Sequence, residues 1–282
     1  MKIIECPRDA MQGIHEFIPT AVKVKYLNTL LKVGFDTLDC GSFVSPKAIP
    51  QMKDTGEVIN QLDLTDTTTK LLTIVANSRG ARDAANHERV SVMGYPFSIS
   101  ETFQLRNTNA TILESLDRVK RIQDICLKHN KTLVIYISMG FGNPYGDEWN
   151  VEIVQKWVAA LVDLDIRIFQ LSDTVGVARP ESIAYLFSRL IPANPAIEIG
   201  AHFHTTPDTW LEKVSTAYEN GCRRFDGTIR GVGGCPMAQN HLVGNMPSEN
   251  LIAFARERNI PIGLNLEYYF DAMKIAGTEV FV

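Results

Sequence analysis

The stretch TILESLDRVKRIQDICLKHNKTLVIYIS, residues 111–138, carries the pattern that predicts the fold. Its first part, Thr111 to Lys128, predicts an amphipathic helix because apolar residues recur at helical spacing, at Ile112, Leu116, Val119 and Ile122. Its second part, Thr132 to Ser138, is a short β-branched and apolar run that predicts a buried strand. A helix followed directly by a buried strand is the repeating unit of α/β proteins.

The same alternation extends from this stretch towards both ends of the 282-residue chain. Eight short runs predict strands, at Lys2–Cys6, Phe35–Cys40, Leu71–Ala76, Val90–Gly94, Thr132–Ser138, Ile166–Leu171, Ile197–His202 and Arg224–Thr228. The clearest helical patterns between them are Thr20–Lys32, Thr111–Lys128, Val151–Leu161, Glu181–Leu190 and Asp208–Glu219.

Eight strands that alternate with helices predict a parallel sheet, because parallel neighbours need a long crossover connection. In a chain of this length the pattern fits a closed (β/α)8 TIM barrel, with an open doubly wound sheet as the alternative. No Pro-, Gly- or Ser-rich linker interrupts the sequence, so we predict one domain over residues 1–282. A barrel brings the carboxyl ends of all its strands to one face, where we expect the functional residues.

The composition is that of a globular protein, with 45% hydrophobic and 21% charged residues and a formal net charge of -4. Lys and Arg are scattered along the chain, so we expect no nucleic-acid partner. No run of about 18 uncharged apolar residues occurs, so we expect no membrane span, no membrane partner and a cytoplasmic protein. The cysteines are odd in number and form no CxxC, which argues against disulfides and a cysteine zinc site. They are Cys6, Cys40, Cys126, Cys222 and Cys235.

Two histidines stand at the end of the seventh predicted strand, in Ala201-His202-Phe203-His204-Thr205. In an extended strand residues i and i+2 point to the same side, so His202 and His204 face one point. Two adjacent neutral imidazoles are a common pair of ligands for a divalent metal. The alternative is a chance HxH on a solvated edge.

The first predicted strand leads into Arg8 and Asp9 and then into a predicted loop over Ala10 to Phe17. In a closed barrel this strand lies beside the eighth and near the seventh, so Asp9 is a candidate third metal ligand. The Arg8 guanidinium is a candidate for holding a carboxylate or a developing enolate oxygen. The alternative is a loop salt bridge between the two.

A glycine-rich active-site loop is predicted after the eighth strand, with glycines at Gly231, Gly233, Gly234 and Gly244. Such a backbone can approach a ligand closely or move over it. Cys235 lies on this loop and is a candidate acid, base or nucleophile; the alternative is a buried thiol without chemistry. Asn245 is either an oxygen ligand or the cap of a helix that starts near Ser248.

Two further strand ends carry carboxylates, Asp39 and Asp173. Each is a candidate partner for Arg8, for a histidine or for a substrate. Each is equally interpreted as an Asx turn at a junction between strand and loop.

Taken together, these motifs resemble the 3-hydroxy-3-methylglutaryl-CoA lyase family, within the metal-dependent barrel lyases and synthases. Pro7-Arg8-Asp9 is similar to the PRD of the family, and the run from Ser42 to Met52 is similar to its SFVSPKxxPQM. The segment 172–177, SDTVGV, resembles its GDTIGV, while His202-x-His204 and the segment 233–239, GGCPMAQ, complete the set. The motifs follow the family order across nearly the whole chain.

The resemblance implies a role for each candidate. It implies that Mg2+ or Mn2+ is bound by Asp9, His202, His204 and Asn245. It implies catalytic roles for Arg8, Cys235, Asp173, Asp39 and His202, with the general base left open among His202, Asp173 and Cys235. It implies that the acyl-CoA substrate is contacted by Arg8, Gln12, Ser42 and Asn107. The reaction implied is the retro-Claisen cleavage of 3-hydroxy-3-methylglutaryl-CoA to acetyl-CoA and acetoacetate, a step of leucine degradation.

The sequence departs from the family pattern in four places. Asp39 stands where the family more often has Glu, and Val134 stands where it has Arg. One extra residue separates Cys235 from Asn245, and Gly142-Asn143-Pro144 replaces a GCP. These changes touch the acyl-group pocket and leave two alternatives open. One is a related lyase or aldolase for another 3-hydroxy-3-methylacyl thioester or a free acid. The other is a non-catalytic barrel that binds a metal or a small ligand.

The stretch from Asn265 to Ala276 is a candidate homodimer surface. Its apolar side chains are Leu266, Tyr269, Phe270 and Met273. The alternative is that they pack on the barrel of the same chain.

Overall fold

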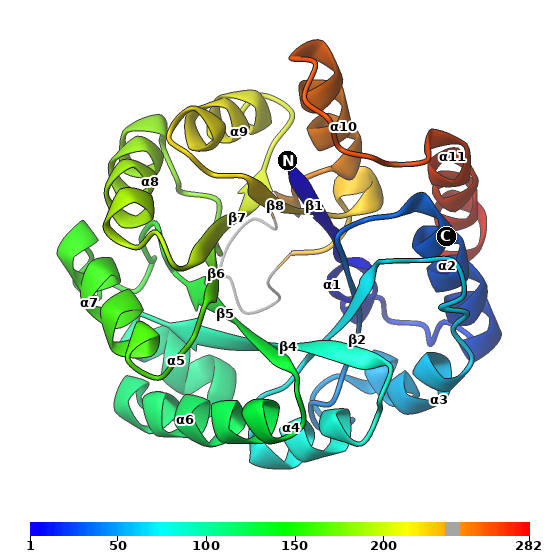
Figure 1. Cartoon of the computed structure of the whole chain (residues 1–282), viewed down its shortest axis with the longest axis horizontal. Helices are drawn as coiled ribbons and strands as arrows, with labels where there is room; N and C mark the ends of the chain where they lie inside the picture. Colours follow the sequence, from blue (N-terminus) through cyan, green and yellow to red (C-terminus); the bar gives the residue numbers. More distant parts are fainter. Residues whose placement is uncertain (235–242) are drawn as a thin grey trace.

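In the computed structural model, which describes residues 1–234 and 243–282, eight parallel strands close into a barrel (Figure 1). Consecutive strands pair from β1 to β8, and β8 pairs with β1. The strands are β1 (Lys2–Glu5), β2 (Thr37–Ser42), β3 (Lys70–Ile74), β4 (Val90–Ser98), β5 (Thr132–Ser138), β6 (Ile168–Asp173), β7 (Glu198–Thr205) and β8 (Arg224–Gly227). The predicted (β/α)8 barrel is confirmed, and the open sheet is wrong because it would leave two edge strands unpaired.

All eight predicted strands are present, but some of their ends differ from the prediction. β4 continues past the predicted end at Gly94, because it pairs with β5 as far as Ser98 and Ser138. β7 continues past His202 to Thr205, because a further short strand, β9 (Gly244–Asn245), pairs antiparallel with its last residues. The second imidazole therefore lies within a strand and is fixed by the pairing.

Eleven α-helices are described. They are α1 (Pro7–Gln12), α2 (Thr20–Val33), α3 (Thr55–Asn60), α4 (Ser78–Ala85), α5 (Glu101–Thr108), α6 (Ile112–Lys128), α7 (Val151–Val162), α8 (Pro180–Ala193), α9 (Trp210–Glu219), α10 (Ser248–Glu257) and α11 (Leu266–Ile275), with short 3-10 turns at Pro50–Met52 and Ile229–Gly231 and a π turn at Ala276–Val280. The loop predicted from Ala10 is wrong in its first part, because α1 extends to Gln12. Proline at the start of α1 favours a helix, since its missing N–H would have no helical partner there.

The helix of the stretch quoted first begins with a capping box. The Glu114 amide donates to Thr111 Oγ1 over 3.1 Å, and the Thr111 amide donates to Glu114 Oε2 over 2.8 Å. These bonds satisfy donors that a helix start leaves free. The buried face of α6 includes Ile112, Val119 and Ile122, as the helical spacing predicts.

Apolar residues form two separate clusters. The residues of the large cluster come from the strands and the surrounding helices and pack against one another. The small one consists of Leu72, Ile74, Val92, Val134 and Tyr136, from β3, β4 and β5. Ile74 and Tyr136 also line the cavity described below, so this second cluster occupies the barrel interior beneath that cavity.

Within the described ranges, no helix combines the length and the apolar character needed to cross a bilayer. The four described cysteines, Cys6, Cys40, Cys126 and Cys222, are free, in line with the sequence argument against disulfides, and all four are buried.

Candidate metal and substrate site

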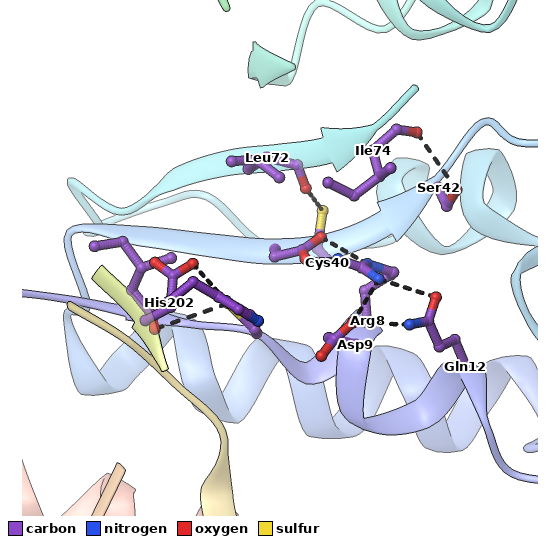
Figure 2. Close-up of polar contacts among 12 residues, drawn as sticks. Arg8, Asp9, Gln12, Cys40, Ser42, Leu72, Ile74 and His202 are labelled. Atoms are coloured by element: carbon purple, nitrogen blue, oxygen red, sulfur yellow. Dashed lines mark hydrogen bonds and ion pairs between the residues drawn. The ribbon is translucent and has the colours of Figure 1, made fainter. Parts of the chain in front are cut away.

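Arg8 is the centre of a buried polar network at the junction of β1 and α1 (Figure 2). Its Nη2 lies 2.5 Å and its Nε 3.0 Å from Asp39 Oδ2, and its Nη1 donates to Asp9 Oδ1 over 2.9 Å. The same Nη1 donates to Gln12 Oε1 over 3.0 Å, and Gln12 Nε2 donates to Asp9 Oδ1 over 2.7 Å. Four predicted site residues therefore meet, and the pairing of Arg8 with Asp9 is buried, unlike an exposed loop salt bridge.

The two carboxylates beside Arg8 differ in their proton affinity. Burial raises the pKa of Asp39 to about 6, although the charge of Arg8 acts in the opposite direction. Burial also acts to raise the pKa of Asp9, but the charges of Arg8 and His202 outweigh it and lower that pKa. Asp9 is therefore the carboxylate that stays ionised over the widest pH range.

Asp9, His202 and His204 each place one potential ligand atom so that the three atoms lie within 4.8 Å of one another. The two imidazole rings have centroids 5.4 Å apart. Burial and the neighbouring His202 lower the pKa of His204 to about 4, so its ring is neutral at physiological pH and keeps a lone pair for a metal. The predicted convergence of β1 and β7 on one point is confirmed.

Asn245 completes this arrangement from β9, directly opposite His204. Its Nδ2 donates to Asp9 Oδ2 over 2.7 Å, whereas its buried Oδ1 has no hydrogen-bond partner in the described part of the chain. A buried acceptor without a partner is costly, and a cation would supply that partner. α10 begins at Ser248 with Pro247 as its N-cap, so the alternative role of Asn245 as a helix cap is wrong.

Gly233 permits this close arrangement. A Cβ at this position would lie 2.8 Å from Asn245 Nδ2 and 2.8 Å from the Asp9 carbonyl oxygen, and its φ is +94°. Both the space and the backbone conformation require glycine. Cys235 and the segment to residue 242 lie outside the described residues.

Asp226 is a site residue that the sequence reasoning missed. Its Oδ2 lies 2.9 Å from His202 Nδ1, and its Oδ1 accepts a hydrogen bond from Gln170 Nε2. Burial acts to lower the pKa of His202, but the hydrogen bond and charge of Asp226 outweigh it and raise that pKa. A carboxylate behind one ring nitrogen fixes which nitrogen is free to bind a metal. Its position near the end of the eighth strand was the available signal.

Cys6 Sγ also lies within 4.8 Å of ligand atoms of His202 and Asp226. Burial and the charge of Asp226 raise the pKa of this thiol well above its usual value. A protonated thiol is a poor ligand, so the set with Asp9 and His204 is the better metal site.

Asp173 lies apart from the other candidates. Its Oδ2 accepts a hydrogen bond from the buried Lys213 over 2.6 Å, and its Oδ1 accepts one from the Ala178 amide over 2.9 Å. Lys213 also donates to the His204 carbonyl over 2.9 Å. The carboxylate of Asp173 therefore supports the backbone of β7.

A cavity of about 400 Å3 opens at this end of the barrel. Its polar wall contains Arg8, Asp9, Gln12, His202 and His204, while Ile74, Ala76, Pro96, Phe103 and Tyr136 contribute to its apolar side. Asn107 also lines the cavity, whereas Ser42 does not. The Ser42 Oγ accepts a hydrogen bond from the Val44 amide over 3.2 Å and so shapes the loop after β2. The Tyr136 ring packs edge-on against His202 at 5.9 Å.

A closed (β/α)8 barrel with one carboxylate, two imidazoles and one amide oxygen at the rim defines the class as a TIM barrel with a candidate site for a divalent metal. The HMGL-like family model matches residues 2–275. This chain belongs to the HMGL-like family, and the resemblance found in its motifs is confirmed.

Similar proteins agree with this assignment. The chain is 32% identical to hydroxymethylglutaryl-CoA lyase YngG of Bacillus subtilis over 271 residues, which cover 95% of this chain and 89% of that protein. The structure of a Bacillus subtilis HMG-CoA lyase matches with a TM-score of 0.92 at 31% identity, covering 99% of this chain and 93% of that one. An HMG-CoA lyase from Acinetobacter baumannii, in complex with coenzyme A and 3-methylmalate, matches with a TM-score of 0.90 at 28% identity, covering 99% and 92%.

Proposed function

We propose that this chain is a divalent-metal-dependent carbon–carbon lyase that cleaves 3-hydroxy-3-methylglutaryl-CoA to acetyl-CoA and acetoacetate. The observation that carries the proposal is the unpartnered Oδ1 of Asn245 beside the converging donors of Asp9, His202 and His204. Relatives that bear the name of this lyase match over nearly the whole chain. We further propose that residues 1–282 form one catalytic domain.

The cleavage needs a metal, an anion-stabilising cation and a proton acceptor. The hydroxyl at C3 loses its proton, the C2–C3 bond breaks, C3 becomes the ketone of acetoacetate, and the electron pair forms the enolate of acetyl-CoA. A proton delivered to C2 then gives acetyl-CoA. Mg2+ or Mn2+, bound by Asp9, His202, His204 and Asn245, would act as a Lewis acid towards the hydroxyl and carboxylate oxygens of the substrate.

Arg8 lines the cavity and is held from behind by Asp39, so its guanidinium is fixed before substrate arrives. A preorganised cation beside the thioester oxygen stabilises the enolate most strongly in the transition state. Gln12, which bonds both Arg8 and Asp9, holds these two paired side chains in fixed positions. We assign to Asp39 the role of orienting Arg8. We assign to Gln12 and Asn107 the role of contacting the substrate.

Three residues remain proposals for the proton acceptor, namely His202, Asp173 and Cys235. Asp173 is paired with Lys213 and does not line the cavity, which favours the other two. We propose that Ser42 affects substrate binding through the loop after β2, which its hydroxyl shapes.

The test is acetoacetate production from 3-hydroxy-3-methylglutaryl-CoA by purified protein, before and after EDTA and after reloading with Mg2+ or Mn2+. We expect activity that EDTA abolishes and that the metal restores, and no activity in His204→Ala. Arg8→Gln should lose about 10² to 10³ in rate, the usual effect of removing a charge-stabilising donor. Full activity of Arg8→Gln would contradict the role of Arg8.

A second substrate has one observation in its favour. Val134 and its neighbours make the barrel interior beneath the cavity apolar, which suits an acyl group with a bulkier alkyl substituent. Turnover of a larger 3-hydroxy-3-methylacyl thioester, or of a free acid, at a higher kcat/KM would favour this alternative. Metal binding without any turnover would favour a non-catalytic barrel.

We also propose a homodimer formed through α11. Leu266, Tyr268 and Phe270 of this helix are exposed, with 65% of Phe270 accessible, whereas Tyr269 and Ala272 are buried against the same chain. Light scattering of the wild type and of Phe270→Asp tests this dimer. A monomeric mass for both proteins would contradict it. A cytoplasmic location and a place in leucine degradation complete the proposal.

A further inference from the structure

Cys6, His202 and Asp226 form a second set of candidate metal ligands inside the barrel, in addition to the set with Asp9 and His204. One potential ligand atom from each of the three, including Cys6 Sγ, lies within 4.8 Å of the other two. Zn2+ holds sulfur at about 2.3 Å and nitrogen or oxygen at about 2.0 to 2.2 Å, so the ligand atoms of one tetrahedral ion are roughly 3 to 4 Å apart. Small rotations of the three side chains therefore bring them around one cation.

The pairing of adjacent strands places these three residues together. Ile4 of β1 pairs with Asp226 of β8, and Cys6 follows Ile4 by two residues, so the two side chains share one side of the chain. The Cys6 amide donates to the Gly227 carbonyl over 2.9 Å, which continues the contact with β8 as far as this residue. Asp226 Oδ2 in turn lies 2.9 Å from His202 Nδ1 on β7. No CxxC motif signals such a site in the sequence, because its ligands come from three different strands.

The charges around Cys6 favour a cation. Burial and three nearby carboxylates raise the pKa of its thiol, while one guanidinium lowers it. The carboxylates are those of Asp226, Asp39 and Asp9, and the guanidinium is that of Arg8. Arg8 already pairs with Asp9 and Asp39, whereas in the described ranges the carboxylate of Asp226 has no Lys or Arg partner. A cation beside Asp226 would neutralise this buried carboxylate.

The thiol decides which cations this set selects. Mg2+ and Mn2+ prefer oxygen ligands and do not displace the proton of a buried thiol, so they take the set with Asp9 and His204. Zn2+ and Cd2+ bind thiolate strongly. When such an ion binds Cys6, the thiol proton is released to the solvent and a metal–sulfur bond takes its place.

We propose that Cys6, His202 and Asp226 bind a thiophilic divalent cation of the Zn2+ and Cd2+ class, and that this cation inhibits the enzyme. A neutral imidazole has one lone pair, so His202 serves one set of ligands at a time. A cation held by Cys6 therefore removes His202 from the set with Asp9 and His204. The inhibition rests on the proposed function, whereas the binding does not.

The first test titrates the metal-free protein with Cd2+, in a buffer without thiol reductant, and follows the ultraviolet charge-transfer band of a cadmium–thiolate bond. We expect the band in the wild type and not in Cys6→Ser, because serine offers no thiol. Cys40→Ser is the matched control, since Cys40 is also a buried free thiol but belongs to neither set of candidate ligands found in the described ranges. Cys235→Ser identifies any band that comes from that thiol. We expect both of these variants to keep the Cys6 band.

A wild type without the band, a band of full intensity in Cys6→Ser, or a band lost completely in Cys235→Ser would overturn the site. The second test measures inhibition of the lyase by Cd2+ in the presence of Mg2+, relative to the rate of each protein without Cd2+. Cys6→Ser should need at least about tenfold more Cd2+ for half inhibition, because it lacks one ligand. Equal inhibition of the wild type and Cys6→Ser would overturn the inhibitory role. A wild type that shows the band but has no lyase activity would defeat the proposed function and still support the binding site.

Discussion

Asp226 Oδ2 lies 2.9 Å from His202 Nδ1, and neither residue is near the other in sequence. The carboxylate comes from β8 and the imidazole from β7, so adjacent strands supply a proposed metal ligand and the group that orients it. Because one ring nitrogen is held by Asp226, the other is presented to the metal site in a fixed tautomer.

The first prediction concerns this pair. Asp226→Asn should weaken Mn2+ binding by about 10- to 100-fold, the usual effect of losing the carboxylate behind a ligating histidine. Isothermal titration calorimetry measures the change, with the exposed Asp124→Asn of α6 as the matched control. Equal affinities in the wild type and Asp226→Asn would show that Asp226 does not orient His202.

The second prediction concerns Gly233. Gly233→Ala should weaken metal binding by at least about tenfold, because its Cβ would displace Asn245 Nδ2 and the Asp9 backbone, both 2.8 Å away. Gly13→Ala is the control, since a Cβ there meets nothing within 4 Å. Calorimetry and circular dichroism distinguish loss of the site from loss of the fold. Wild-type affinity in Gly233→Ala would contradict the close packing around Asn245.

The third prediction separates a structural from a catalytic Asp173. Lys213→Met leaves the buried Asp173 carboxylate without its cation, so the free energy of unfolding should fall by about 3 to 5 kcal/mol. Adding Asp173→Asn should restore part of it, because the unpaired charge is then removed. Urea denaturation measures both.

The rate of the double variant decides the role of Asp173. If it retains most of the wild-type kcat, Asp173 acts only by supporting β7. If kcat is lost in every variant that lacks Asp173 but is kept in a folded Lys213→Met, Asp173 is the proton acceptor.

The fourth prediction concerns the dependence of stability on pH. Burial raises the pKa of Glu5 to about 8, although hydrogen bonds from Ser248 and the Ile229 amide oppose this shift. The folded protein therefore holds a proton that the unfolded chain releases above about 4.5. The contribution of Glu5 to stability is complete below that pH and declines as pH rises through about 8, by up to about 1.4 kcal/mol for each pH unit.

Glu5→Gln should remove this decline, because glutamine carries no ionisable proton. Urea denaturation at several values between pH 5 and pH 9 should show the variant gaining stability relative to the wild type as pH rises. Glu257→Gln, an exposed carboxylate at the end of α10, serves as the control. Parallel pH curves for the wild type and Glu5→Gln would contradict the raised pKa.

The eight strands could be predicted from sequence because each is a short apolar run between helical patterns, and local spacing alone carries that signal. The HxH pair could be found for the same reason, since residues i and i+2 of a strand share a side. Strand ends were less accurate: β7 reaches Thr205 because β9 pairs with it, a contact about forty residues away in the chain.

The sequence by itself determined the alternation of strands and helices, and hence the barrel that brings Asp9 near His202 and His204. Only the tertiary structure decided which carboxylates serve the site, because Asp39, Asp173 and Asp226 all stand near strand ends. Asp39 meets Arg8, Asp173 meets Lys213 and Asp226 meets His202. The physical reason is that burial forces each charge to find a partner, and that partner lies on another element whose position local sequence does not encode.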